Sequence, residues 1–538
     1  MKKLTLLLLI TMTISCSKKE KVDIIIINAT IYTVNDNFDK AEAFAVKDGK
    51  IIDVGTTSII QSKYASTFIN DVQGKTVVPG LIDAHCHFYG LGLQQQKVDL
   101  TGTKSFDEVI QKIVDFQKEK NVSYITGRGW DQNDWKIKEF PSNEKLNKLF
   151  PDTPISIRRI DGHALLANQA AIDLAGVTIN TPFSGGEIHQ KNGKLTGLFI
   201  DNPMELIESE IPKPSKSEQI QALKDAEKIS ISHGLTTVDD AGLSREIIEL
   251  IDSLHLAGDL KIRIYAMVSN TPKDVDYYLS KGIVKTNRLN VRSIKVYGDG
   301  ALGSRGAAMK EPYSDKHNHY GAILSTPEEY MNIAKQIAAS DYQMNSHAIG
   351  DSANYLMLKT YKDVLKEKKD RRWRIEHAQI LDPEDFKYFD NILPSIQPTH
   401  ATSDMYWAKD RIGVERMKGA YAYKDLLNNY GKVALGTDFP IERVSPFLTF
   451  YAAVARKDLN NYPENGFQME NALTREETLK GMTIWAAYSN FEENEKGSIE
   501  VGKLADFIIL DKNIMKIKVE KIPYIKVKEV YINGERVK

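Results

Sequence analysis

The stretch Val-Val-Pro-Gly-Leu-Ile-Asp-Ala-His-Cys-His, residues 77–87, indicates the fold class of this chain. An apolar run with β-branched residues leads into His85 and His87, which are two positions apart. On a strand, residues at this spacing point to the same face. Cys86 then points to the other face, where we expect a small buried hydrophobe rather than a ligand. Two imidazoles on one face can share a cation.

Four later stretches repeat this arrangement, with a polar residue at the carboxyl end of an apolar run. They are Lys295 in Ile-Lys-Val-Tyr, His347 in Asn-Ser-His-Ala, His377 in Arg-Ile-Glu-His-Ala-Gln and Asp438 in Ala-Leu-Gly-Thr-Asp-Phe-Pro. A (β/α)₈ barrel collects its catalytic groups at this end of its strands. The ordered set is a strong signal, whereas a single His-x-His pair is a weak one.

The middle of the chain alternates short apolar runs with helical segments, which predicts an α/β fold, the (β/α)₈ TIM barrel. The eight expected strands are 81–84, 236–238, 262–268, 293–297, 343–346, 373–376, 393–397 and 433–436. Capping boxes at Thr326 and Thr474 mark two helix starts. With 538 residues, the chain is long enough for a barrel and a smaller domain.

Strand-like segments at both ends predict a small composite β-sandwich built from residues 22–78 and 497–538. The barrel then occupies residues 79–496, with an insertion of about 100–230 after its first strand. A long insertion at the top of a barrel strand is expected to act as a lid or specificity element. The alternative is a subdomain far from the chemistry.

Four histidines at expected strand ends predict a metal site, since neutral imidazole is a good ligand for zinc. The predicted ligands are His85, His87, His347, His377, Lys295 and Asp438, around one or two divalent ions, zinc above all. Asp438 is also the expected general base, because a carboxylate beside an activated water can take its proton. The alternative for Asp438 is the N-cap of the next helix.

This pattern resembles the amidohydrolase superfamily, in particular its N-substituted formamide deformylase-like branch, amidohydrolase family 3. The resemblance covers nearly the whole chain and implies a hydrolase of C–N bonds other than peptide bonds. The expected substrate is a small amide, formamide or N-acyl compound attacked by a metal-activated water. Alternatives are an ester, cyclic amide or exocyclic amine substrate, or a non-catalytic surface binding protein. Composite terminal sandwiches are standard in this superfamily.

Lys295 is expected to face the barrel interior, where a lone ammonium beside cations is unfavourable. Many members of the resembled superfamily carry a carboxylated lysine that bridges two metals, which is the role we expect here. The alternative is a cationic Lys295 paired with Asp299. The predicted catalytic residues are thus Asp438, Lys295 and His377.

Four further residues are candidates for substrate binding. His163 and Trp130 lie in the insertion, Arg305 lies in the glycine-dense loop after the fourth strand, and His400 follows the seventh. For Arg305, a structural pair with an acid is an equally good interpretation. For His163, a core or solvent-facing position is the common alternative.

The N-terminus reads as an export signal. Lys2 and Lys3 precede an apolar core and a small-residue site that ends at Cys16. This resembles a bacterial lipoprotein signal, so residues 1–21 are expected to be a signal peptide and tether, with Cys16 lipidated. The protein would then be exported and membrane-anchored, at the periplasmic face or the cell surface. A plain secretory signal is the alternative.

Bulk composition excludes one class of function. Hydrophobic residues make up 42% of the chain and charged residues 27%, which is ordinary for a globular protein. The formal net charge of −1 gives no electrostatic basis for nucleic-acid binding. Self-association to a homo-oligomer is left open by the sequence.

Overall fold

Eight parallel strands form the barrel in the computed structural model, which describes residues 19–160, 162, 164–183, 186–366 and 368–538. All eight expected strands are confirmed, each hydrogen-bonded to the next in chain order. They are β10 (Leu81–Cys86), β17 (Leu235–Leu243), β18 (Arg263–Ser269), β20 (Leu289–Tyr297), β21 (Gln343–Ala348), β22 (Arg374–His377), β23 (Leu393–Ile396) and β24 (Ala434–Leu435).

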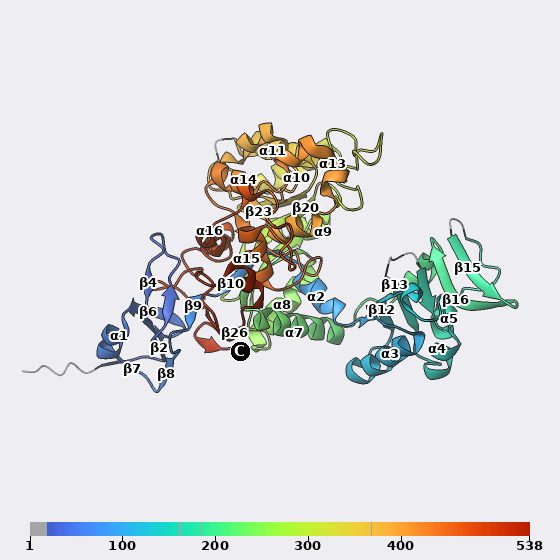
Figure 1. The fold of residues 1–538 in the computed structure, drawn as a ribbon, viewed down its shortest axis with the longest axis horizontal. Helices are drawn as coiled ribbons and strands as arrows, with labels where there is room; N and C mark the ends of the chain where they lie inside the picture. The colour runs from blue at the N-terminus through green and yellow to red at the C-terminus, as the bar shows by residue number, and fades with distance from the viewer. Residues whose placement is uncertain (1–18, 161, 163, 184–185, 367) are drawn as a thin grey trace, which may run out of the picture.

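Helices surround the strands (Figure 1). The outward apolar side chains of the strands, such as Ile294 and Val296, lie in the main hydrophobic core. The expected capping boxes at Thr326 and Thr474 are both present. The main helices of the barrel are α7 (Lys216–Ser232), α8 (Arg245–Ala257), α9 (Pro272–Lys281), α10 (Pro327–Ala338), α11 (Asp351–Leu365), α12 (Pro398–Asp404), α14 (Tyr423–Tyr430), α15 (Pro446–Ala455), α16 (Arg475–Gly481) and α17 (Ile484–Ser489).

The barrel closes where its first and last strands meet. The amide of Asp438 donates to the carbonyl oxygen of His85 at 2.8 Å, and the amide of His87 donates to that of Phe439 at 2.7 Å. Below them, the Asp83 carboxylate accepts hydrogen bonds from the amide and the hydroxyl of Thr437, at 3.0 and 2.7 Å. The closing seam therefore fixes the backbones of His85, His87 and Asp438 side by side.

The two ends of the chain form one composite β-domain, as predicted. Its sheets have the orders β6-β5-β2-β8 and β27-β26-β25-β9-β3-β4. Their bounds are β2 (Ile24–Ile27), β3 (Thr30–Tyr32), β4 (Lys40–Ala41), β5 (Ala43–Lys47), β6 (Lys50–Gly55), β8 (Phe68–Asp71), β9 (Thr76–Pro79), β25 (Phe507–Leu510), β26 (Val527–Ile532) and β27 (Glu535–Arg536). Phe44 meets Phe507 edge to face between the sheets, with ring centroids 4.9 Å apart.

The insertion after β10 and α2 (Phe88–Gln94) has its own six-stranded sheet and its own hydrophobic cores. Its strands are β11 (Val98–Asp99), β12 (Ile125–Trp130), β13 (Ile155–Arg159), β14 (Ala164–Ala167), β15 (Gly186–Lys191) and β16 (Lys194–Asp201), with α3 (Phe106–Lys120), α4 (Glu144–Leu149), α5 (Gln169–Leu174) and α6 (Met204–Glu208). The next helix, α7, packs on α2 and β17. Helix α7 therefore belongs to the barrel, and the insertion ends before this helix rather than near residue 230, the end expected from the sequence.

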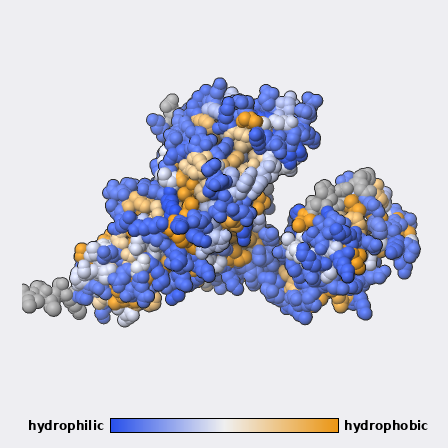
Figure 2. Space-filling model, viewed as in Figure 1, coloured by the Kyte–Doolittle hydropathy of each residue, from blue (hydrophilic) through white to orange (hydrophobic). Residues whose placement is uncertain are grey.

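The insertion stands beside the barrel and is joined to it near α2 and α7 (Figure 1). The space-filling view in Figure 2 shows an open notch between the two parts, with hydrophilic residues over much of both surfaces. The insertion therefore forms a wall of an open cleft and does not close over it as a lid here. Across the described residues, no helix is both long and apolar enough to cross a membrane.

Candidate metal-dependent active site

The carboxyl ends of five barrel strands bring the predicted residues together around His85. The Lys295 ammonium nitrogen lies 3.2 Å from Nε2 of His85, and Oδ1 of Asp438 lies 3.8 Å from the same atom. The ring of His377 is 4.7 Å from that of His85, and the ring of His347 is 4.5 Å from that of His377. His85, Lys295, His377 and Asp438 are almost completely buried, which is unusual for so many titratable side chains.

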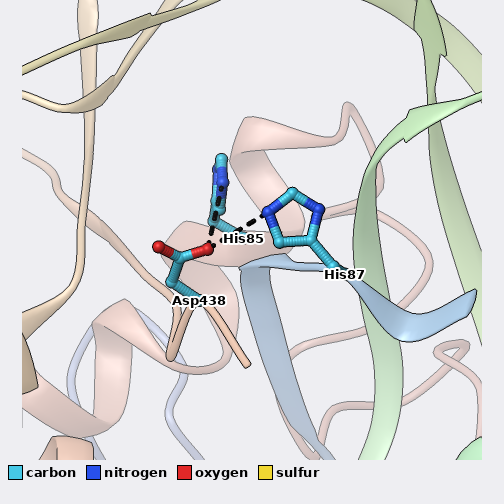
Figure 3. A group of neighbouring side chains, drawn as sticks. All are labelled: His85, His87 and Asp438. Carbon is cyan, nitrogen blue, oxygen red and sulfur yellow. Dashed lines mark ion pairs between the residues drawn. The ribbon is translucent and has the colours of Figure 1, made fainter. Parts of the chain in front are cut away.

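Two histidines of the first strand segment face the carboxylate of Asp438 (Figure 3). Nε2 of His87 lies 3.3 Å from Oδ1 of Asp438, and the three side chains are close enough to share one ion. The spacing of two residues therefore places both imidazoles on one side of the barrel mouth, as the strand geometry predicts.

A second group with ligand geometry contains His377, His400 and Asp438. Nε2 of His400 lies 3.3 Å from Oδ2 of Asp438. The two carboxylate oxygens of Asp438 thus face different histidine groups, one on each side. His400 was predicted as a substrate-binding residue, and its place in this group makes it a candidate ligand as well.

Several buried polar atoms of the site have no hydrogen-bond partner among the described residues. They include Oδ1 of Asp438, Nε2 of His400 and Nε2 of His347. Leaving such an atom unsatisfied costs about 1–3 kcal/mol. Imidazole nitrogens and carboxylate oxygens are the donors that zinc-type ions take. A divalent cation would satisfy these atoms, so the residues present fit a metal.

Hydrogen bonds to the other ring nitrogen orient three of the histidines. Nδ1 of His85 lies 2.7 Å from Oε2 of Glu376, and Nδ1 of His377 lies 2.7 Å from Oε1 of Gln397. Nδ1 of His87 lies 3.1 Å from the carbonyl oxygen of Ala241. Such partners fix the tautomer and would aim Nε2 at a bound metal.

Sequence reasoning did not assign a role to Glu376. Strict alternation along β22 would place Glu376 and His377 on opposite faces. His377 has a φ of +76°, outside the strand region, so both side chains reach the barrel interior. The only clue to Glu376 in the sequence was that it directly precedes His377.

Lys295 and Asp299 do not form the pair that was one alternative for Lys295. The Asp299 carboxylate accepts hydrogen bonds from the amides of Ala308, Ile349 and Gly350, at 2.9, 3.0 and 2.8 Å. It therefore anchors the loops after β20 and β21. Burial lowers the pKa of Lys295 to about 8, against the opposite effect of nearby carboxylates.

Asp438 does not cap the following helix. Helix α15 begins at Pro446 with Ser445 as its N-cap, several residues further on. Asp438 has a φ of +62°, which turns its side chain into the histidine cluster. Burial acts to raise its pKa, but the contacts with His400 and His87 dominate and lower the pKa well below its ordinary value. The carboxylate is thus held in its charged form.

Two predicted substrate-binding residues make structural contacts within the protein. Trp130 is fully buried in the core of the insertion, where its indole donates to the carbonyl oxygen of Ile157 at 3.0 Å. Arg305 pairs with Asp315 at 2.9 Å in the loop after β20, which is the structural role that was its alternative. His163 and Cys16 lie outside the described residues.

A (β/α)₈ barrel with this cluster at its mouth defines a metal-dependent hydrolase. Residues 69–538 match the model of the amidohydrolase family, so the chain belongs to that family and the resemblance seen in the sequence is confirmed. The composite terminal domain agrees with this assignment.

Known proteins similar to this chain agree with the family. Protein LONG AFTER FAR-RED 3 of Arabidopsis thaliana is 33% identical, over 91% of this chain and 87% of its own. N-substituted formamide deformylase of Arthrobacter pascens is 25% identical, over 95% and 97%. An uncharacterized metal-dependent hydrolase from Pyrococcus furiosus superposes with a TM-score of 0.78 and 26% identity, over 92% of this chain and 100% of that one.

The contact between Glu376 and His85 generates a first prediction. Glu376→Gln keeps the shape of the side chain but removes the charge that holds the His85 ring, so metal affinity should fall about 10-fold to 100-fold. The measurement is competition with a chelator, with circular dichroism as the check on folding. Glu249→Gln, on the exposed face of α8, is the matched control. Equal metal affinity in wild type and Glu376→Gln would contradict the role assigned to Glu376.

Proposed function

We propose that this metal-dependent hydrolase cleaves a C–N bond other than a peptide bond, in a small amide, formamide or N-acyl compound. The observation that carries the proposal is the position of Asp438, whose two oxygens face separate histidine groups at 3.3 Å. One carboxylate can then serve both as ligand and as proton carrier. The similarity to N-substituted formamide deformylase supports the substrate class.

The chemistry divides between the ion and the side chains. A bound divalent ion, zinc in this proposal, would supply Lewis acidity and an acidified water. Asp438 would accept a proton from the attacking water and donate it to the leaving nitrogen, which must be protonated to depart as an amine. His85, His87 and His377 would hold the ion through Nε2, since their Nδ1 atoms are already bound.

The two ligand groups that share Asp438 favour a site for two ions. Lys295 lies on β20, the strand between β18 and β21, and its nitrogen is beside His85. In the described part of the chain, no carboxylate lies within ion-pair distance of this nitrogen. An ammonium has donors and no lone pair, so it cannot be a ligand. We propose that Lys295 is carboxylated, because a carbamate supplies two oxygens for the ions.

Lys295→Ala should therefore lose bound metal and turnover together, while Lys295→Glu, which restores a carboxylate, should recover part of the metal. Metal content is measured by elemental analysis of the purified protein, with circular dichroism to confirm folding. A full metal complement in Lys295→Ala would show that Lys295 is not a ligand and would favour a site for one ion.

Asp438→Asn keeps the shape and one ligand oxygen of the side chain but removes the base. Turnover should fall by roughly 10²-fold or more, the scale of general acid–base catalysis, with the fold intact. The assay is a panel of N-formyl and N-acyl compounds beside esters, cyclic amides and exocyclic amines. Chelation should abolish turnover, and Asp259→Asn on the outer surface is the control. If only esters or exocyclic amines are turned over, the proposed amide substrate class is wrong.

We also propose that the protein is an exported lipoprotein anchored through Cys16, on the basis of the signal-like residues before it. Cys16→Ala should move the protein from the membrane fraction to a soluble or unprocessed form. Stable anchoring needs more than one acyl chain, since a single chain binds marginally. Fractionation followed by mass spectrometry of the mature N-terminus is the measurement. A wild-type protein found wholly in the soluble fraction would contradict the anchor.

A further inference from the structure

A cleft of about 980 Å³ lies between the barrel and the insertion. Its barrel wall includes Gly90 and Leu93 of α2, a helix that begins directly after His87. It also includes Pro440, two residues after Asp438. The cleft is therefore bounded by the chain segments that continue from two candidate metal ligands, which is where the distal part of a substrate would extend.

The opposite wall is one face of the parallel part of the insertion sheet. Strands β12 and β13 run parallel, and Thr126 and Arg128 of β12 and Ser156 and Arg158 of β13 line the cleft. Residues two apart on a strand share a face. The other face of these strands carries Ile157, which packs in the core of the insertion.

The charged residues of the lining leave two cations without a carboxylate partner. Arg158 is paired with Glu208. Asp99 accepts a hydrogen bond from the Thr101 amide at 2.9 Å. The other lining cations are Lys97 and Arg128, and within the described residues neither forms an ion pair.

Arg128 is the stronger of these two cations for recognition. Its side chain is exposed and donates from one nitrogen, Nη2, to the carbonyl oxygen of Ile160 at 3.0 Å. That contact fixes the guanidinium and leaves its other donors for a ligand. The lining carries three cations and two carboxylates, so it has an excess of one positive charge. This excess matches the charge of a ligand with one carboxylate.

Apolar side chains complete the cleft. Leu93, Ile160, Leu165 and Ile211 line it, and Ile160 is 43% exposed. A fully hydrophilic ligand would leave Ile160 in water, together with the exposed parts of Leu93 and Ile211. A ligand with an apolar group beside its anionic end would cover them and gain about 25 cal/mol for each Å² of apolar surface removed from water.

We propose that this cleft recognises an N-acyl substrate that carries a carboxylate beside an apolar group, with Arg128 as the residue that binds the carboxylate and Lys97 in support. A guanidinium can bind a carboxylate through two parallel hydrogen bonds. The proposal rests on the C–N hydrolysis proposed above and specifies its substrate class as anionic.

The kinetic test compares N-formyl-phenylalanine with N-formyl-phenylalaninamide, which has the same skeleton without the charge. The wild type should prefer the acid. Arg128→Gln should raise KM for the acid about 10-fold to 100-fold, the loss expected for a hydrogen bond between charged groups, and leave the amide within about twofold. Lys97→Gln should have a smaller effect in the same direction. Arg245→Gln, on α8 outside the cleft, is the matched arginine control.

A binding measurement separates this inference from the catalytic proposal. Calorimetry of the metal-loaded protein with 3-phenylpropanoate, which has no bond to hydrolyse, should show binding that Arg128→Gln weakens and Arg245→Gln does not. Equal binding to wild type and Arg128→Gln, or equal loss for acid and amide in the kinetic test, would overturn the inference. Absence of turnover on every amide, formamide and N-acyl compound would overturn the proposed function, while the calorimetry would still decide on Arg128.

Discussion

Closure of the barrel between its first and last strands is the constraint on which the site depends. Hydrogen bonds of 2.8 and 2.7 Å join the backbones of His85 and His87 to those of Asp438 and Phe439. The three candidate ligands at this seam are therefore neighbours because the sheet closes, although some 350 residues separate them in the chain. The buried Asp83–Thr437 contacts reinforce the seam one layer below. Anything that opens it would separate the ligands.

Beneath the site, the barrel interior is polar and depends on one buried guanidinium. Arg374 bonds to Asp239 at 3.0 Å and lies 4.0 Å from Glu376, which in turn bonds to His85. Burial acts to lower the pKa of Arg374, but Asp239 and other anionic groups dominate and raise it. Burial acts to raise the pKa of Glu376, but His85 and, after it, Arg374 lower that pKa, so Glu376 stays ionised and holds the histidine. Packing and ligand orientation are coupled through this chain of contacts.

The sequence was sufficient for the barrel because the expected strands are apolar runs, five of which carry candidate site residues at their carboxyl ends, and parallel strands share one mouth. It could not place Glu376, since the positive φ of His377 breaks the alternation that assigns side chains to faces. Trp130 was misplaced for another reason: aromatic residues in an insertion serve its own core as readily as a site. The end of the insertion was missed because α7 packs on α2, a tertiary contact with no local signal.

The same α2–α7 contact fixes the barrel wall of the cleft relative to the candidate metal site. A Cβ on Gly92 of α2 would lie 1.9 Å from the carbonyl oxygen of Ala222 in α7, so the two helices meet backbone to backbone. Because α2 starts at the residue after His87, this close packing fixes one wall of the cleft relative to a candidate metal ligand. The other wall belongs to a sheet with a core of its own. The insertion can therefore vary its lining, and with it the substrate, without disturbing the seam that holds the ligands.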